Sequence, residues 1–124
     1  MLRRNKPLAR TGRLNPVSAN ARAAQTVQRQ AYAAAGTSEW CEACGCPGPL
    51  DHSHCLTQHQ HPKHRNNPLN WLMLCRADHD LWENNKAAFA LRYPNAFAEK
   101  MRRMQVLDPQ AAAVFRMKWQ VLFR

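Results

Sequence analysis

No part of this chain is apolar over a length that would cross a membrane, and the start of the chain lacks the apolar core of a secretory signal peptide. A membrane-spanning helix needs about twenty apolar residues in a row, and none of the 124 residues lies in such a run. A signal peptide needs a shorter apolar core near its start. Both absences argue against a membrane partner and predict a cytoplasmic protein.

Acidic residues are also scarce. Asp and Glu together number 8 against 18 Lys and Arg, which gives a net charge of +10. A charge of this size favours a polyanionic partner, and nucleic acid is the leading candidate. Residues 1–36 contain no acid and hold these basic residues: Arg3, Arg4, Lys6, Arg10, Arg13, Arg22 and Arg29.

The first 36 residues divide into two parts. Residues 1–16 have little apolar content and contain Pro7, Gly12 and Pro16, so we expect a mobile basic arm that neutralises phosphates. The Ala- and Gln-rich run that follows predicts a helix that ends at Gly36. We therefore treat 1–36 as arm and helix, and 37–124 as the functional domain.

The cysteines indicate a metal site. Five is an odd number, and in a reducing compartment Cys-x-x-Cys is more often a metal or redox site than part of a disulfide framework. Two half-sites about thirty residues apart have zinc-ligand spacing: Cys41, Cys44, Cys75 and Asp78. A fourth thiolate is more usual than a carboxylate, so Cys46 or Cys55 is an alternative to Asp78. A domain of this size buries only about two thirds of its unfolded surface, so a zinc cross-link would help it fold.

A second set of metal-ligand types lies between and after the cysteines. Residues 50–56 are predicted to form a strand, in which Asp51 and Ser53 face one way and His52 and His54 face the other. A bulge or bend in the strand would be needed for Asp51 and a neighbouring histidine to contact the same phosphate. A helix is predicted from about residue 77, and it places His79 and Glu83 one turn apart.

The remaining segments are more ordinary. Residues 57–68 are polar and basic, which predicts a surface loop in contact with a nucleic-acid backbone. Residues 71–74 are apolar and predict a short buried strand. Helices are predicted up to Pro94, from Pro94 and from Pro109, with apolar stripes that form the core. Basic residues on the other faces of these helices, among them Arg102 and Arg103, would extend the basic surface.

The order Cys-x-x-Cys, Asp-His, Asn, Cys-x-x-ligand, His resembles the HNH, or ββα-metal, endonucleases, and specifically the zinc-stapled kind carried by phages and prophages. The resemblance covers residues 40–89. It implies an α+β fold in which a β-hairpin packs on a helix, with flanking N- and C-terminal helices. It also implies a phage-encoded, metal-dependent endonuclease that hydrolyses DNA phosphodiester bonds in the cytoplasm of a bacterial host cell.

The resemblance assigns roles to several residues. Asp51 and His79 would bind the catalytic ion, with Glu83 at the position of a further ligand in colicin-type members. His52 would be the general base and Asn70 would orient it. The nine-residue step from Asn70 to His79 matches the family. The ion would be Mg²⁺, Mn²⁺, Ni²⁺ or Zn²⁺, separate from the structural Zn²⁺.

Two alternatives remain open at the base. The tetrad of residues 51–54, Asp-His-Ser-His, is similar to the Asp-His-Asp-His of phage junction resolvases of the endonuclease VII type, in which both histidines serve the site. Other phage members have Ser-His followed by an aliphatic residue, an alignment that makes His54 the base. We favour His52 because it adjoins Asp51. The rival function is a zinc module that binds nucleic acid without cleaving it.

Overall fold

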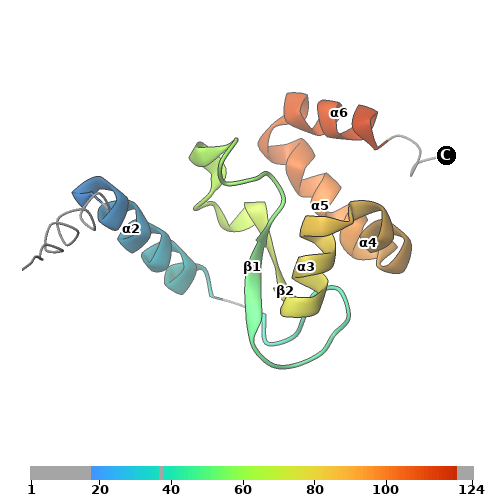
Figure 1. Ribbon diagram of the computed structural model, residues 1–124, viewed down its shortest axis with the longest axis horizontal. Helices are drawn as coiled ribbons and strands as arrows, with labels where there is room; N and C mark the ends of the chain where they lie inside the picture. Colours follow the sequence, from blue (N-terminus) through green and yellow to red (C-terminus); the bar gives the residue numbers. More distant parts are fainter. Residues whose placement is uncertain (1–17, 37, 120–124) are drawn as a thin grey trace, which may run out of the picture.

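The structure is a computed structural model that describes residues 18–36 and 38–119. The described residues form an α+β fold with an N-terminal helix, a two-stranded antiparallel hairpin and then a series of helices (Figure 1). This fold class is the one predicted from the sequence. The basic arm of residues 1–16 lies outside the described residues. No described helix is long and apolar enough to cross a membrane.

The hairpin pairs β1 (Leu50–His54) with β2 (Trp71–Cys75). The register is regular and runs from Leu50 opposite Cys75 to His54 opposite Trp71. The alternation predicted for this strand is therefore kept, without a bulge that would turn Asp51 and His52 to the same side. β1 ends two residues earlier than predicted.

Four helices follow the hairpin. Helix α3 (Arg76–Asn84) begins directly after β2, one residue before the predicted start. Helix α4 (Lys86–Arg92) is capped by the Asn85 side chain, which accepts a hydrogen bond from the amide of Ala88. Helices α5 (Pro94–Leu107) and α6 (Pro109–Lys118) each start with proline, which is favoured in the first helical turn because it lacks an amide hydrogen.

The core lies between the hairpin and these helices. Trp82 of α3 is 1% exposed and packs its ring against Phe89, Phe97 and Phe115 at centroid distances of 5.4, 6.1 and 6.1 Å. Such aromatic contacts bury large apolar areas and fix the relative positions of the elements that carry them. These contacts fix α3 to α4, α5 and α6, and the Trp82 indole joins them to the hairpin by donating to the His54 carbonyl at 3.2 Å.

Helix α5 also holds the hairpin through two basic side chains. The Lys100 ammonium group is fully buried and donates to the carbonyl oxygen and hydroxyl of Ser53, at 3.0 and 2.9 Å. Arg103 donates to the carbonyl oxygen of Trp71 at 2.9 Å and pairs with Glu99 at 2.7 Å. Arg102 also pairs with Glu99, at 2.6 Å. Part of the basic surface expected on α5 is thus engaged within the protein.

Helix α2 (Ala19–Ala35) lies on the other side of the hairpin from α3 (Figure 1). Ser18 caps it by accepting a hydrogen bond from the amide of Ala21, and Gly36 ends it with a φ of 72°. No residue of α2 is fully buried, and Val27 is 51% exposed. α2 is therefore thinly attached compared with the helices around Trp82.

Candidate functional site

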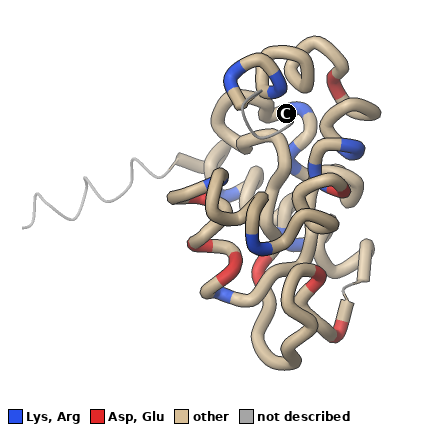
Figure 2. The backbone as a smooth tube through the Cα atoms, turned by 90° about the vertical axis from the view of Figure 1, so that its right-hand side faces the viewer, with Lys and Arg blue, Asp and Glu red and all other residues tan. Residues whose placement is uncertain are grey.

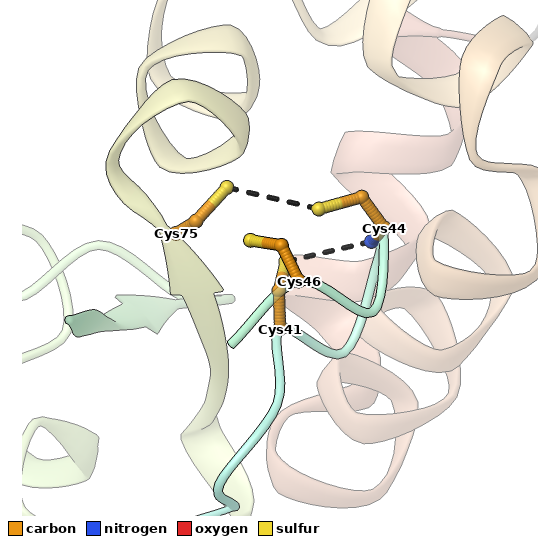
Figure 3. Close-up of side chains that lie close together, drawn as sticks. All are labelled: Cys41, Cys44, Cys46 and Cys75. Carbon is orange, nitrogen blue, oxygen red and sulfur yellow. Dashed lines mark hydrogen bonds between the residues drawn. The ribbon is translucent and has the colours of Figure 1, made fainter. Parts of the chain in front are cut away.

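Four thiols meet where the segment before β1 passes the end of β2. The Sγ atoms of Cys41, Cys44, Cys46 and Cys75 all lie within 4.8 Å of one another (Figure 3). Thiolate sulfur is a preferred zinc ligand, and four in this arrangement suit a tetrahedral ion. Among the described residues these are the ones whose ligand atoms converge closely enough to hold a metal ion.

A tight turn positions the sulfurs of Cys41, Cys44 and Cys46. The amide of Cys41 bonds to the carbonyl of Cys46 at 2.9 Å, and the amide of Gly45 bonds to the carbonyl of Cys41 at 2.9 Å. Gly45 has a φ of 80°, a conformation that side chains disfavour. Glu42 attaches the turn to β2, because its amide donates to the Met73 carbonyl at 2.8 Å and its carboxylate accepts from the Met73 amide at 2.7 Å.

Cys46 thus takes the fourth thiol position that the sequence left open. Cys55, the other alternative, is buried in the hydrophobic core and is not part of the cluster. Asp78 lies beside the thiols, with its carboxylate 3.2 Å from the sulfur of Cys41 and 3.3 Å from that of Cys75. The cluster therefore has a carboxylate at its edge as well as four sulfurs.

Hydrogen bonds in the cluster alter the acidity of its thiols. The side-chain hydrogen bond with Asp78 raises the pKa of Cys44 to about 11, and burial raises the pKa of Cys75 to about 11. Burial also acts to raise the pKa of Cys41, but backbone amides that donate to its sulfur outweigh it and the pKa is lowered. A metal ion must displace the protons held on these thiols, so its binding would release protons.

A second group of polar residues lies on the α3 side of β1. Nδ1 of His79 is 3.1 Å from Oδ2 of Asp51, and the guanidinium of Arg76 reaches the same oxygen at 2.7 Å. Arg76 also pairs with Asp80 at 3.1 Å. The structure therefore brings together the two residues that the resemblance assigns to the catalytic ion.

Glu83 approaches the other side of the His79 ring. Its carboxylate lies 4.0 Å from Nε2, whereas Asp51 faces Nδ1. Carboxylate and imidazole are suitable ligands for a divalent ion. However, the two carboxylates lie next to different nitrogens of the His79 ring, so the ligand atoms of Asp51, His79 and Glu83 do not converge on one point. The predicted three-ligand set fits in its chemistry but not in its geometry.

His52 lies on the opposite face of β1, under α2. The Tyr32 ring stacks on the His52 ring with a centroid distance of 3.6 Å and an interplanar angle of 9°. Trp71 meets both rings edge-on, at 5.0 Å from Tyr32 and 5.1 Å from His52. Burial lowers the pKa of His52, and its Nε2 atom is buried without a hydrogen-bond partner.

His54 shares that face but is more enclosed. It is 8% exposed, and its Nε2 lies 3.0 Å from the carbonyl oxygen of Arg65, in the loop between the strands. Burial lowers the pKa of His54 as well. Since its outer nitrogen is already engaged, His54 contributes to the attachment of the loop.

Asn70 is fully buried just before β2. Its carbonyl oxygen accepts from the Leu56 amide at 2.8 Å, and its NH₂ group donates to the Leu56 carbonyl at 3.0 Å. Its backbone carbonyl also accepts from the amide of Cys55 at 2.7 Å. Both ends of the side-chain amide are used in holding the chain at the end of β1, so Asn70 fixes the strand that carries the histidines.

Searches for similar proteins gave no match among protein-family models, curated proteins or solved structures.

Proposed function

We propose that this chain is a metal-dependent endonuclease of the ββα-metal type that hydrolyses DNA phosphodiester bonds. The observation that carries the proposal is the 3.1 Å contact between Asp51 of β1 and His79 of α3; β1 also carries His52, on its opposite face. A carboxylate and an imidazole supplied by a hairpin and the following helix are the kind of pair that holds a divalent ion beside a phosphate.

We assign a structural Zn²⁺ to the thiol cluster. The sulfurs of Cys41, Cys44, Cys46 and Cys75 provide a complete tetrahedral set, with no position left for a water or substrate. The ion would join the turn before β1 to the end of β2. This position between the two halves of the hairpin gives zinc a role in folding rather than in the reaction.

Within this proposal His52 acts as the general base. Burial lowers its pKa, which favours the neutral imidazole that can take a proton from the attacking water. Nε2 of His52 is unpartnered, whereas Nε2 of His54 is engaged by the Arg65 carbonyl, so His52 is the better placed of the two histidines. Asn70 holds the strand in position through Leu56.

Asp51 and His79 are the residues that would hold the catalytic ion. A bound divalent ion stabilises the negative charge that develops on the phosphate and the leaving oxygen. Glu83 is assigned a supporting role at the outer nitrogen of His79. Arg76, which reaches Asp51 from the surface, supplies positive charge at the same place.

The basic charge supports a nucleic-acid partner. All 8 acidic residues lie within the described part of the chain, whereas the arm before residue 18 carries none. Figure 2 shows basic and acidic positions interspersed over the described residues. The excess positive charge is therefore greatest in the arm, which we assign to phosphate contacts.

The alternative is a zinc-binding module that binds nucleic acid without cleaving it. It is favoured by one observation: among the described residues, closely converging ligand atoms occur at the thiol cluster and not at Asp51, His79 and Glu83. In this alternative the protein binds one metal ion. The endonuclease needs a second ion that can be exchanged without unfolding.

A plasmid-nicking assay combined with metal analysis tests the proposal. The full chain is assayed with Mg²⁺, Mn²⁺, Ni²⁺ and Zn²⁺, and the variants are His52→Ala, His79→Ala and, as a control in the exposed part of the loop, His59→Ala. We expect His52→Ala to slow nicking about a hundredfold without weakening DNA binding. His79→Ala should lose activity that excess metal partly restores, and His59→Ala should behave as the wild type. A protein that binds DNA but nicks it with none of the four ions would refute the endonuclease.

A further inference from the structure

His52, the proposed general base, is covered by α2, the helix that is most weakly attached to the core. Tyr32 lies flat on His52 at 3.6 Å, and the outer nitrogen of His52 is buried without a partner. A buried polar nitrogen without a hydrogen bond is unfavourable compared with the same nitrogen in water. The closed arrangement is therefore sterically incompatible with a water or phosphate at that nitrogen, and it also leaves a polar group unsatisfied.

The attachment of α2 is weak. Its inner side is a stripe of partly buried residues that includes Ala24, Gln28, Ala31 and Tyr32, and none of them is fully buried. Apart from the ring contacts of Tyr32, Gln28 forms one exposed hydrogen bond to Gln58 of the loop, at 2.6 Å. Segments with few buried apolar contacts open at low free energy while the core stays folded.

The outer side of α2 is suited to a polyanion. Arg22 and Arg29 are exposed, and the helix Ala19–Ala35 contains no Asp or Glu. Two guanidinium groups on a helix without acids bind phosphate oxygens well. The same helix therefore carries both the cover over His52 and the charge that a nucleic-acid backbone would attract.

We propose that α2 is a removable cover: Tyr32 closes His52 in the free protein, and a nucleic-acid backbone stabilises the open state, in which it can contact Arg22, Arg29 and the freed imidazole together. This regulation rests on the proposed function, since it gives the opened His52 a phosphodiester to act on. It predicts that access to His52, and not the chemistry itself, is limited by the Tyr32 stack.

The first test needs no cleavage. The full chain is treated with diethyl pyrocarbonate, and the rate of modification at His52 is measured by mass spectrometry relative to the exposed His59. In the wild type we expect His52 to react much more slowly than His59. Tyr32→Ala should speed the His52 reaction by about tenfold or more, because the reaction rate follows the fraction of open molecules. Tyr32→Phe keeps the ring and should leave the protection unchanged.

The second test uses substrates of two sizes. Bis(p-nitrophenyl) phosphate is too small to bind α2 and His52 together, so Tyr32→Ala should hydrolyse it faster than the wild type does. With saturating plasmid DNA, Arg22→Gln/Arg29→Gln should nick slowly, and adding Tyr32→Ala should restore the rate because no cover remains to be drawn away. This restoration would not occur if the two arginines only supplied affinity.

The two tests separate failure of the cover from failure of the endonuclease. Equal modification of His52 in the wild type and Tyr32→Ala would overturn the cover whether or not the protein cleaves DNA. Slower hydrolysis by Tyr32→Ala would also overturn it, because Tyr32 would then position His52 instead of blocking it. Protection of His52 that is lost in Tyr32→Ala, in a protein without nicking activity, would retain the cover and reject the endonuclease.

Discussion

Lys100 offers a sharp test of how the hairpin is held, because its ammonium group is fully buried. It donates to Ser53 at the carbonyl oxygen and the hydroxyl and contacts the His54 carbonyl at 3.4 Å. Its Nζ also lies 4.3 Å from the centre of the Trp82 ring, where a cation is favoured. Burial nevertheless lowers the pKa of Lys100 from 10.5 to about 8.

Replacing Lys100 by methionine removes both the charge and the donor. At pH 7 we expect Lys100→Met to lower the free energy of unfolding by about 1–3 kcal/mol, because buried acceptors on Ser53 lose their partner. The pH dependence is the more specific prediction. Below pH 8 the folded protein contains a buried charge, which lowers its stability. This cost falls as the pH rises from about 8 to 10.5, since the folded protein then releases a proton that the unfolded chain still holds.

The direction of this pH effect follows from the difference in proton binding between the folded and unfolded protein. Stability of the wild type should rise with pH through this range, relative to Lys100→Met, by about 2 kcal/mol between pH 7 and pH 10. The four clustered thiols are the same in both proteins and are not among the groups that contact Lys100, so their contribution cancels in the difference. Urea denaturation of the zinc-loaded proteins at several pH values measures it.

Lys86 provides a matched control. Its ammonium group also lies over the Trp82 ring, at 4.5 Å, and donates to the Trp82 carbonyl at 3.0 Å, but it is only partly buried. Lys86→Met should show a smaller change with pH than Lys100→Met. If the free energies of unfolding of the wild type and Lys100→Met change with pH in the same way from pH 7 to pH 10, protonation of Lys100 is not coupled to folding.

Three further predictions concern the zinc site, the end of β1 and the arm. Cys46→Ser should weaken zinc binding by at least about a hundredfold in a chelator competition, whereas Cys55→Ser should retain zinc; equal affinities would remove Cys46 from the site. Asn70→Ala should lower the free energy of unfolding by about 2–4 kcal/mol, and the exposed Asn67→Ala by about 1 kcal/mol or less, as measured in urea; similar losses would contradict the buried role of Asn70. Deleting residues 2–16 should flatten the salt dependence of DNA affinity by up to about four to five in log–log slope, and an unchanged slope would show that the arm does not touch phosphate.

The secondary structure was largely predictable because its signals are local. The strand predicted over residues 50–56 forms as β1, the apolar run of residues 71–74 forms β2, and Pro94 and Pro109 begin helices as expected. The thiol cluster was predictable to the level of two half-sites. The presence of Cys46 rather than Cys55 in the cluster could not be predicted from the sequence. It depends on how the turn at Gly45 orients the cysteine side chains and on the burial of Cys55 in the core.

The contacts that the sequence did not predict are long-range. Nothing in the helical pattern of α2 marks Tyr32 as the residue that stacks on His52, twenty positions later. Lys100 lies in α5 between Glu99 and Met101, and a lysine is ordinarily expected at the surface. Its burial follows from acceptors on β1 that only the folded hairpin provides. A carboxylate at residue 78 indicated a ligand, but its place beside the thiols depends on the start of α3.

The helices on the two faces of β1 differ in how firmly they are attached. Asp51 and Ser53 face α3 and α5, where His79 contacts Asp51 and the buried Lys100 donates to Ser53. His52 faces α2, a helix that contains no fully buried residue. Because the register of the hairpin is regular, one phosphate can approach both Asp51 and His52 only along the edge of β1 that does not pair with β2. Opening α2 clears the His52 face of β1 without disturbing the core, so the weak attachment of α2 and the alternation of β1 favour the same route for the proposed substrate.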